Sequence, residues 1–330
     1  MNRHLFLSVC VAGTLGLLAG CQPHRASFEA PKGVHRYVEG AELLQQGRRQ
    51  QAIAELEAAV QENPDLISPR NLLGKAYRDD REYKKALVEY QNLVRLDPYT
   101  VSNHYYLGLC YHLLDQLGNA EAAYLDALRL DPRDFKSNMN LGLVKLALGE
   151  DQAAVHYLQT ATDIDPKSAP AWSNYAVALD SIGHYAEAEQ CYRRSLELDA
   201  NNTAALLDFG TNLLLQNKTA EAQAILGPLS NRLDTPMAHK RYGDALAQSK
   251  DYTAAKKQYN ITLKLDSRYY PALTGLGDVA IAEYEKGLEL DDSLRITALS
   301  DWKKSLAINS DQSTVGEKVK KWEHPPLFGK

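Results

Sequence analysis

The stretch of sequence that decides the fold is VSNHYYLGLCYHLLDQLGNAEAAYLDALRLDP, which runs from Val101 to Pro132. Its apolar residues recur at intervals of three and four, which is typical of amphipathic helices. The closing Asp131-Pro132 ends the second half, because proline has no amide donor and clashes with a continuing helix. The stretch therefore predicts two short helices joined by a turn.

Small residues repeat along the chain with a period of 34. Glycines occupy one slot, which Ala176 takes once and which later moves by one residue: Gly40, Gly74, Gly108, Gly142, Gly210, Gly243 and Gly277. Alanines stand twelve residues after the first seven slots, at Ala52, Ala86, Ala120, Ala154, Ala188, Ala222 and Ala255. We expect the small residue of the first helix to face that of the second, so that the two backbones approach closely. A fixed period of this length predicts stacked helical pairs.

These glycine and alanine slots resemble the tetratricopeptide repeat, as do the prolines that close the copies at Pro64, Pro98, Pro132 and Pro166. Seven clear copies run from about Gly33 to Ser267, and an eighth is irregular. The resemblance implies an all-α, right-handed superhelical α-solenoid of about eight helix pairs over residues 34–311. Residues 312–330 would then form a capping helix and a loose tail.

Two copies depart from the pattern. In the sixth, Gly227-Pro228 predicts an interruption of the second helix. In the eighth, we expect a lengthened first helix to about Leu290 and a second helix over Leu294–Ile308. Ser313–Trp322 would follow as a polar capping helix, which the end of a repeat array requires.

The first 21 residues have a different character. Arg3 precedes the apolar run Leu5–Leu18, which as a helix would cross only about two-thirds of a bilayer core. The run therefore predicts a signal peptide over residues 1–20. The following Leu-Ala-Gly-Cys resembles a bacterial lipobox, which implies cleavage before Cys21, acyl chains on its thiol and a flexible tether over residues 21–33.

An ordinary signal peptide, cut near Ala19 or Gly20, is the alternative. With Cys21 as a multiply acylated N-terminus, the protein would be anchored to a membrane without spanning it. Gln22 stands where an aspartate would favour the inner membrane. The resemblance thus implies an outer-membrane anchor facing the periplasm.

Composition excludes several functional classes. The 330 residues carry a net charge of only -5, without the clustered basic face that nucleic-acid binding normally shows. No zinc-protease histidine pair, phosphate-binding glycine loop, Gly-x-Ser-x-Gly or Cys-x-x-Cys motif occurs. We expect no enzyme activity, cofactor or metal. Cys110 and Cys191 are expected to be buried free thiols.

Candidate binding residues flank the central glycine of the first helices. In the resembled family these helices line a concave groove. The side chains predicted to face it in copies one to four are Tyr37, Asn71, Lys75, Arg78, Tyr105, Leu109, His112, Lys136 and Asn140. Tyrosines mixed with hydrogen-bond donors suit an extended peptide. A merely solvated face is the alternative.

The sequence thus indicates a membrane-anchored scaffold that holds a protein or peptide partner during cell-envelope assembly. It is similar to lipoproteins that assist assembly of the type IV pilus secretin, a likeness of fold. The alternative is a recruiting subunit for polysaccharide export, peptidoglycan synthesis or a glycosyltransferase on another chain. Only Lys136 fits the family's clamp for a terminal carboxylate, so that clamp is not predicted.

Overall fold

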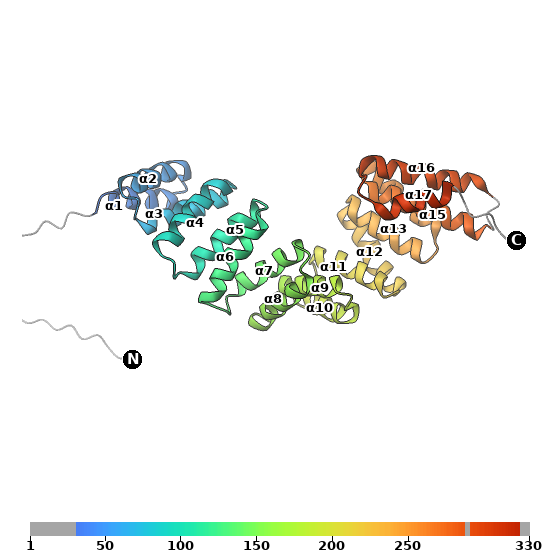
Figure 1. Ribbon diagram of the computed structural model, residues 1–330, viewed down its shortest axis with the longest axis horizontal. Coiled ribbons are helices and arrows are strands. Elements are labelled where there is room, and N and C mark those ends of the chain that lie inside the picture. Colours follow the sequence, from blue (N-terminus) through green and yellow to red (C-terminus); the bar gives the residue numbers. More distant parts are fainter. Residues whose placement is uncertain (1–30, 288–290, 324–330) are drawn as a thin grey trace, which may run out of the picture. The chain divides into compact units, whose positions relative to one another are not determined.

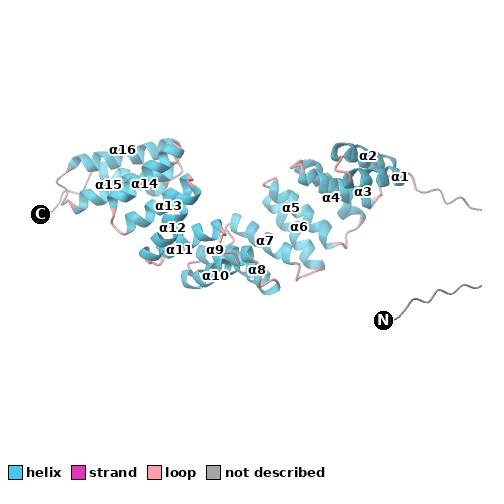
Figure 2. Ribbon diagram, turned by 180° about the vertical axis from the view of Figure 1, so that it is seen from behind, coloured by secondary structure: helices cyan, strands magenta, loops and turns pink. Residues whose placement is uncertain are grey.

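The computed structural model describes residues 31–287 and 291–323, and all regular structure in these ranges is helical (Figures 1 and 2). This confirms the all-α prediction. The predicted signal peptide and Cys21 lie outside the described residues. The helices are α1 Val34–Gln45, α2 Arg49–Glu62, α3 Ile67–Asp79, α4 Tyr83–Leu96, α5 Val101–Leu113, α6 Leu117–Leu130, α7 Phe135–Ala147, α8 Asp151–Ile164, α9 Ala169–Ser181, α10 Tyr185–Leu198, α11 Thr203–Leu215, α12 Thr219–Leu233, α13 Pro236–Gln248, α14 Tyr252–Leu265, α15 Tyr270–Lys286, α16 Asp292–Ile308 and α17 Ser313–Glu323.

The turn within each of the first seven helix pairs uses one left-handed residue at the same slot. The backbone φ there lies between 58° and 81°, in the region that glycine, asparagine and aspartate tolerate best. These residues are Gly47, Arg81, Asp115, Gly149, Gly183, Asn217 and Lys250. The second helices of the first four pairs end two residues before a proline, as predicted. Backbone conformation therefore repeats with the sequence.

The repeated glycines also make a contact that the sequence did not predict. A Cβ atom added to Gly108 would lie 2.7 Å from Cδ1 of Tyr124, a large side chain of the second helix. One added to Gly142 would lie 2.5 Å from Cγ of Leu158. The alanines are fully buried as well, and at Gly40 the added Cβ would also lie 3.2 Å from the carbonyl oxygen of Ala52, in line with the expected close approach. The glycine makes room for a bulky residue sixteen positions later.

Helices α3 to α17 belong mostly to one compact unit that begins at Arg70, and the residues before it form another. In the first unit α1 packs against α2, where Leu56 covers Gly40. In the second unit, each first helix from α5 onward packs against its own second helix. The first helices α5, α7, α9, α11, α13 and α15 also contact one another in succession (Figure 1). Together with α3, whose Arg78 lies against the Tyr106 ring of α5, they form a continuous layer, which we call the first-helix face.

The two irregular copies differ in part from expectation. Helix α12 runs through Pro228, so the predicted interruption is wrong. Helix α15 is lengthened as predicted, but it ends at Lys286 instead of Leu290. Helix α16 ends at Ile308 as expected, but it begins at Asp292, two residues before the predicted Leu294. The segment between them, residues 288–290, lies outside the described ranges.

Helix α17 caps the C-terminal end of the repeats, as predicted. Val315, Val319 and Trp322 are buried against a cluster that includes Tyr284 and Trp302. The Tyr284 and Trp322 rings meet edge to face, with centroids 5.9 Å apart. The cap thus covers the apolar side of the last pair. Within the described ranges, no helix combines the length and apolarity needed to cross a membrane.

Candidate functional site

Four of the side chains on α3, α5 and α7 form a connected row, which we call the cation–aromatic strip: Arg78, Tyr106, Tyr105 and Lys136. The Arg78 guanidinium lies 4.6 Å from the centroid of the Tyr106 ring. The Tyr105 and Tyr106 rings meet edge to face at 5.0 Å. Lys136 Nζ lies 5.8 Å from the centroid of Tyr105. Three consecutive first helices are therefore joined by alternating charge and aromatic surface.

The rings of the strip are held from behind by tyrosines of the second helices. Tyr106 stacks on buried Tyr90, with centroids 5.3 Å apart, and Tyr105 packs on buried Tyr124 at 5.9 Å. Burial raises the pKa of Tyr105, so its hydroxyl stays protonated at neutral pH. The two rings are thus fixed in place before any ligand arrives, which lowers the entropy cost of binding.

The other predicted groove residues are placed as follows. Asn71 and Lys75 are exposed on α3, the helix that carries Arg78. Leu109 and His112 are half-buried on α5, and burial lowers the pKa of His112, which leaves its imidazole neutral at pH 7. Asn140 donates to the carbonyl oxygen of Lys136 at 2.9 Å. Of the nine predictions, contacts thus join Arg78, Tyr105 and Lys136 in the strip.

Tyr37 lies on α1, in the unit that precedes Arg70, and is half-buried there. Its neighbour Arg36 donates to Glu55 at 2.9 Å within the same unit. Tyr106, by contrast, belongs to the strip but was missing from the predicted groove. A signal for it was present, because Tyr106 stands two residues before the glycine, the slot that Asn140 fills in the next copy.

A second polar site, which the sequence did not predict, lies between α13 and α15. This C-terminal cleft has a volume of about 350 Å³ and is lined in part by Lys240, Tyr259 and Thr274. Asp244 accepts hydrogen bonds from Tyr259 Oη at 2.9 Å and Lys240 Nζ at 2.7 Å. Asp278 in the next copy accepts from Trp302 Nε1 at 3.0 Å. Both aspartates directly follow the repeated glycine, which was the available signal.

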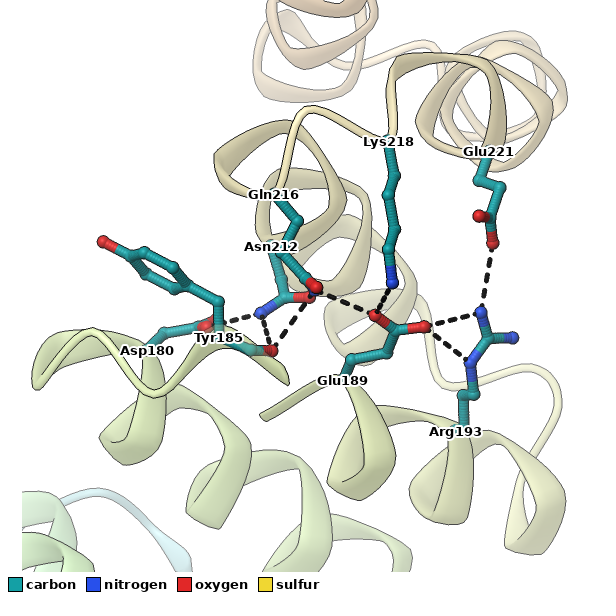
Figure 3. Close-up of polar contacts among 8 residues, drawn as sticks. All are labelled: Asp180, Tyr185, Glu189, Arg193, Asn212, Gln216, Lys218 and Glu221. Carbon is teal, nitrogen blue, oxygen red and sulfur yellow. Dashed lines mark hydrogen bonds and ion pairs between the residues drawn. The ribbon is translucent and has the colours of Figure 1, made fainter. Parts of the chain in front are cut away.

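A cluster of polar side chains lies between the fifth and sixth pairs (Figure 3). Buried Glu189 accepts hydrogen bonds from Lys218 at 2.6 Å, Gln216 at 2.9 Å and Arg193 at 2.8 Å. Burial alone would raise its pKa, but these donors lower the pKa of Glu189 to about 2. The carboxylate therefore stays charged and joins α10 to the turn between α11 and α12.

Asn212 extends this cluster on α11. It is fully buried and donates to Asp180 at 2.6 Å and to the carbonyl oxygen of Tyr185 at 2.9 Å. The same slot holds Cys110, Val144 and Ala178 in the preceding pairs. A buried amide at an otherwise apolar position is stable only when its hydrogen bonds are satisfied. We interpret the cluster as a polar joint between two helix pairs.

The thiols and possible metal ligands complete the inventory. Cys110 and Cys191 are buried and free, as predicted. Burial raises the pKa of Cys110 to about 11 and that of Cys191 to about 12, so neither thiol ionises at neutral pH. Over residues 31–287 and 291–323, no group of three His, Cys, Asp or Glu side chains is arranged to hold a metal ion.

Solved structures share this architecture at low sequence identity. A tetratricopeptide repeat protein from Parabacteroides merdae superposes with a TM-score of 0.58 at 15% identity, covering 89% of this chain and 100% of that one. The pilF protein of Pseudomonas aeruginosa gives 0.55 at 20% identity, covering 66% of this chain and 97% of that one. At these identities the likeness concerns the fold alone.

Similarity to known sequences also falls within the repeats. Superkiller complex protein 3 of Mus musculus is 28% identical over 145 residues, which is 42% of this chain and 7% of that protein. The chain thus corresponds to a small fraction of this relative's length. Family models described as tetratricopeptide repeat match residues 37–99, 71–135, 135–168 and 169–202, together about half of the sequence. The chain belongs to the tetratricopeptide repeat family, whose scaffolds mediate protein–protein interaction.

Proposed function

We propose that this protein is a lipid-anchored adaptor that binds a protein partner on its first-helix face during assembly of a cell-envelope machine. The observation that carries the proposal is the cation–aromatic strip across α3, α5 and α7. Tyrosine and arginine are the residues that dominate binding energy at protein interfaces. In the strip they are ordered by contacts within the chain and remain partly open to solvent.

The anchoring part of the proposal is supported by the sequence Leu-Ala-Gly-Cys that ends at Cys21. Acyl chains on this residue would hold the protein at a membrane surface. A partner bound on α3 to α7 would then be kept near that membrane. Assembly of a pilus or a secretion machine is the proposed setting, and likeness of fold to pilF is consistent with it.

Site-specific photo-cross-linking in cells tests the proposal. Benzoyl-phenylalanine in place of exposed Lys75 should give a discrete adduct with one protein, identified by mass spectrometry. The control places the same probe at Tyr99, which is 83% exposed in the loop before α5. This control should give no discrete adduct. The adduct should disappear in a Tyr105→Ala background whose circular dichroism is unchanged. Adducts that are absent at Lys75, or equal at both positions, would rule out the strip as the binding site.

A further inference from the structure

The cation–aromatic strip has an unbalanced charge. Helices α5 and α7 contain no aspartate or glutamate. Lys136 forms no ion pair with any described residue. On α3, Arg78 meets Asp79 at 3.2 Å, an exposed contact that uses one of its five N–H groups. Arg78 is therefore partly neutralised by Asp79, whereas the charge of Lys136 meets no carboxylate among the described residues.

The remaining first helices have the opposite character. The first helices α9, α11, α13 and α15 each carry one aspartate. In chain order these are Asp180, Asp208, Asp244 and Asp278. Arg241 pairs with Asp208 at 2.8 Å, and Lys318 with Asp278 at 2.7 Å. In this part of the face, carboxylates of the chain itself satisfy the cations.

The buried tyrosines behind the face reflect the same difference. Tyr192 donates its hydroxyl hydrogen to Asp180, and Tyr259 donates to Asp244, each at 2.9 Å. Tyr124 occupies the equivalent slot in the third pair, and its buried hydroxyl has no hydrogen-bonding partner among the described residues. The strip thus lies where the repeat array lacks the carboxylate that the fifth and seventh pairs supply to this tyrosine.

We propose that the cation–aromatic strip binds an extended protein segment through aspartate or glutamate side chains within that segment. The inference rests on the proposed function and names the class of partner. Arg78 and Lys136 lie at the two ends of the strip and would each meet a carboxylate, while the Tyr105 and Tyr106 rings support the intervening chain. Cations held against aromatic rings are already oriented, so binding loses little side-chain entropy.

The length of the segment follows from helix packing. Neighbouring helix axes lie about 10 Å apart, so α3 to α7 spans about 20 Å, which an extended chain covers in about six residues. Nucleic acid also carries negative charge, but a longer polyanion would run onto α9 to α15, where Arg241 and Lys318 are already paired with aspartates of the chain. A short acidic peptide segment fits within the strip itself.

Fluorescence anisotropy on the purified chain can test the charge class. The probes are two eight-residue peptides, one alternating Glu with Ala and the other alternating Gln with Ala. Both carry an amidated C-terminus, so that no terminal carboxylate contributes. The Glu peptide should bind at least about tenfold more tightly, with an affinity that falls as salt rises. A free-acid version should bind equally well.

Charge reversal locates the binding site. Lys136→Glu should weaken binding of the Glu peptide at least about tenfold. Lys257→Glu makes the same charge change at an exposed position on α14 and should leave the affinity within about twofold. Thermal unfolding of both variants checks that each is folded.

Three results would overturn the inference: no binding of the Glu peptide at about 1 mM, equal binding of the Gln peptide, or equal effects of the two lysine variants. Tighter binding of an eight-nucleotide single-stranded DNA would also overturn it, because that result assigns the strip to nucleic acid. Cross-linking from position 75 detects a bound protein whether or not its segment is acidic. An adduct there together with a failed Glu peptide would leave the proposed function standing and remove only the acidic partner.

Discussion

At the scale of single residues, Glu189 shows how a charged side chain can be buried in a stack of helices. The residue is only 8% exposed to solvent. Its carboxylate accepts hydrogen bonds from Lys218, Arg193 and Gln216. Removing water from a carboxylate is costly unless cations and donors replace it. Here they do, because its pKa is lowered to about 2 against an ordinary value of 4.5.

We predict that Glu189→Gln lowers the free energy of unfolding by about 1–3 kcal/mol at pH 7, because it leaves Lys218 and Arg193 without their shared carboxylate. The folded-state pKa lies below the unfolded value, so the stabilisation is fully present above pH 4.5 and is lost as the pH falls towards 2. Urea titrations at pH 7 and pH 3 should show the difference from wild type shrinking. Glu187→Gln, at an exposed position on the same helix, is the control. A difference that grows at low pH would contradict the assigned role.

At the scale of helices, α12 shows that a proline does not have to end a helix. Pro228 is exposed, so the carbonyl that loses its intrahelical partner can bond to water. Ser230 donates its hydroxyl hydrogen to the carbonyl oxygen of Gly227 at 2.8 Å. Leu226 and Leu229 are buried on the opposite side. Tertiary packing of these leucines outweighs the local cost of the proline.

Replacing this proline should therefore stabilise the helix. We expect Pro228→Ala to raise the free energy of unfolding by about 1–3 kcal/mol, since alanine restores an amide donor inside α12. The midpoint of thermal unfolding, followed by circular dichroism, measures the change. Pro170→Ala is the matched control, because Pro170 stands in the first turn of α9, where proline is tolerated. An unchanged or lower midpoint for Pro228→Ala would show that the proline fits α12 without cost.

At the scale of the whole molecule, the proposed function needs two parts of the chain that are far apart in sequence. Cys21 would supply membrane attachment, and the strip would supply the binding surface. A single acyl chain holds a protein at a bilayer only marginally, whereas two or more hold it stably. The anchored form would therefore keep a bound partner at the membrane for as long as the complex lasts.

Cell fractionation tests this attachment. Cys21→Ser should move the protein from the membrane fraction to the soluble fraction and abolish labelling by a radioactive fatty acid. Cys10→Ser changes the other cysteine of the same N-terminal region and should leave both unchanged. If the Cys21→Ser protein remained in the membrane fraction without label, attachment would have a different origin.

The candidate site could be predicted from the sequence only in part. Arg78, Tyr105 and Lys136 follow from their slots in the repeat, which place them on successive first helices. Tyr106 and the C-terminal cleft were missed, because their repeat slots place the side chains near the glycine but do not say which side chains of other helices they contact. Nothing in the local sequence of Asp244 says that Tyr259, fifteen residues later, donates to it.

The sequence by itself determined the repeat, the helix pairs and the closing helix, because the spacing of small residues and prolines acts locally along each backbone. Only the tertiary structure decided what those positions touch. The glycines make room for large side chains of the second helix, α12 continues through Pro228, and Asn212 donates a hydrogen bond to Asp180, 32 residues before it. Such contacts form when helices far apart in sequence pack together. Their energy depends on both contacting residues, so it cannot be inferred from either local sequence alone.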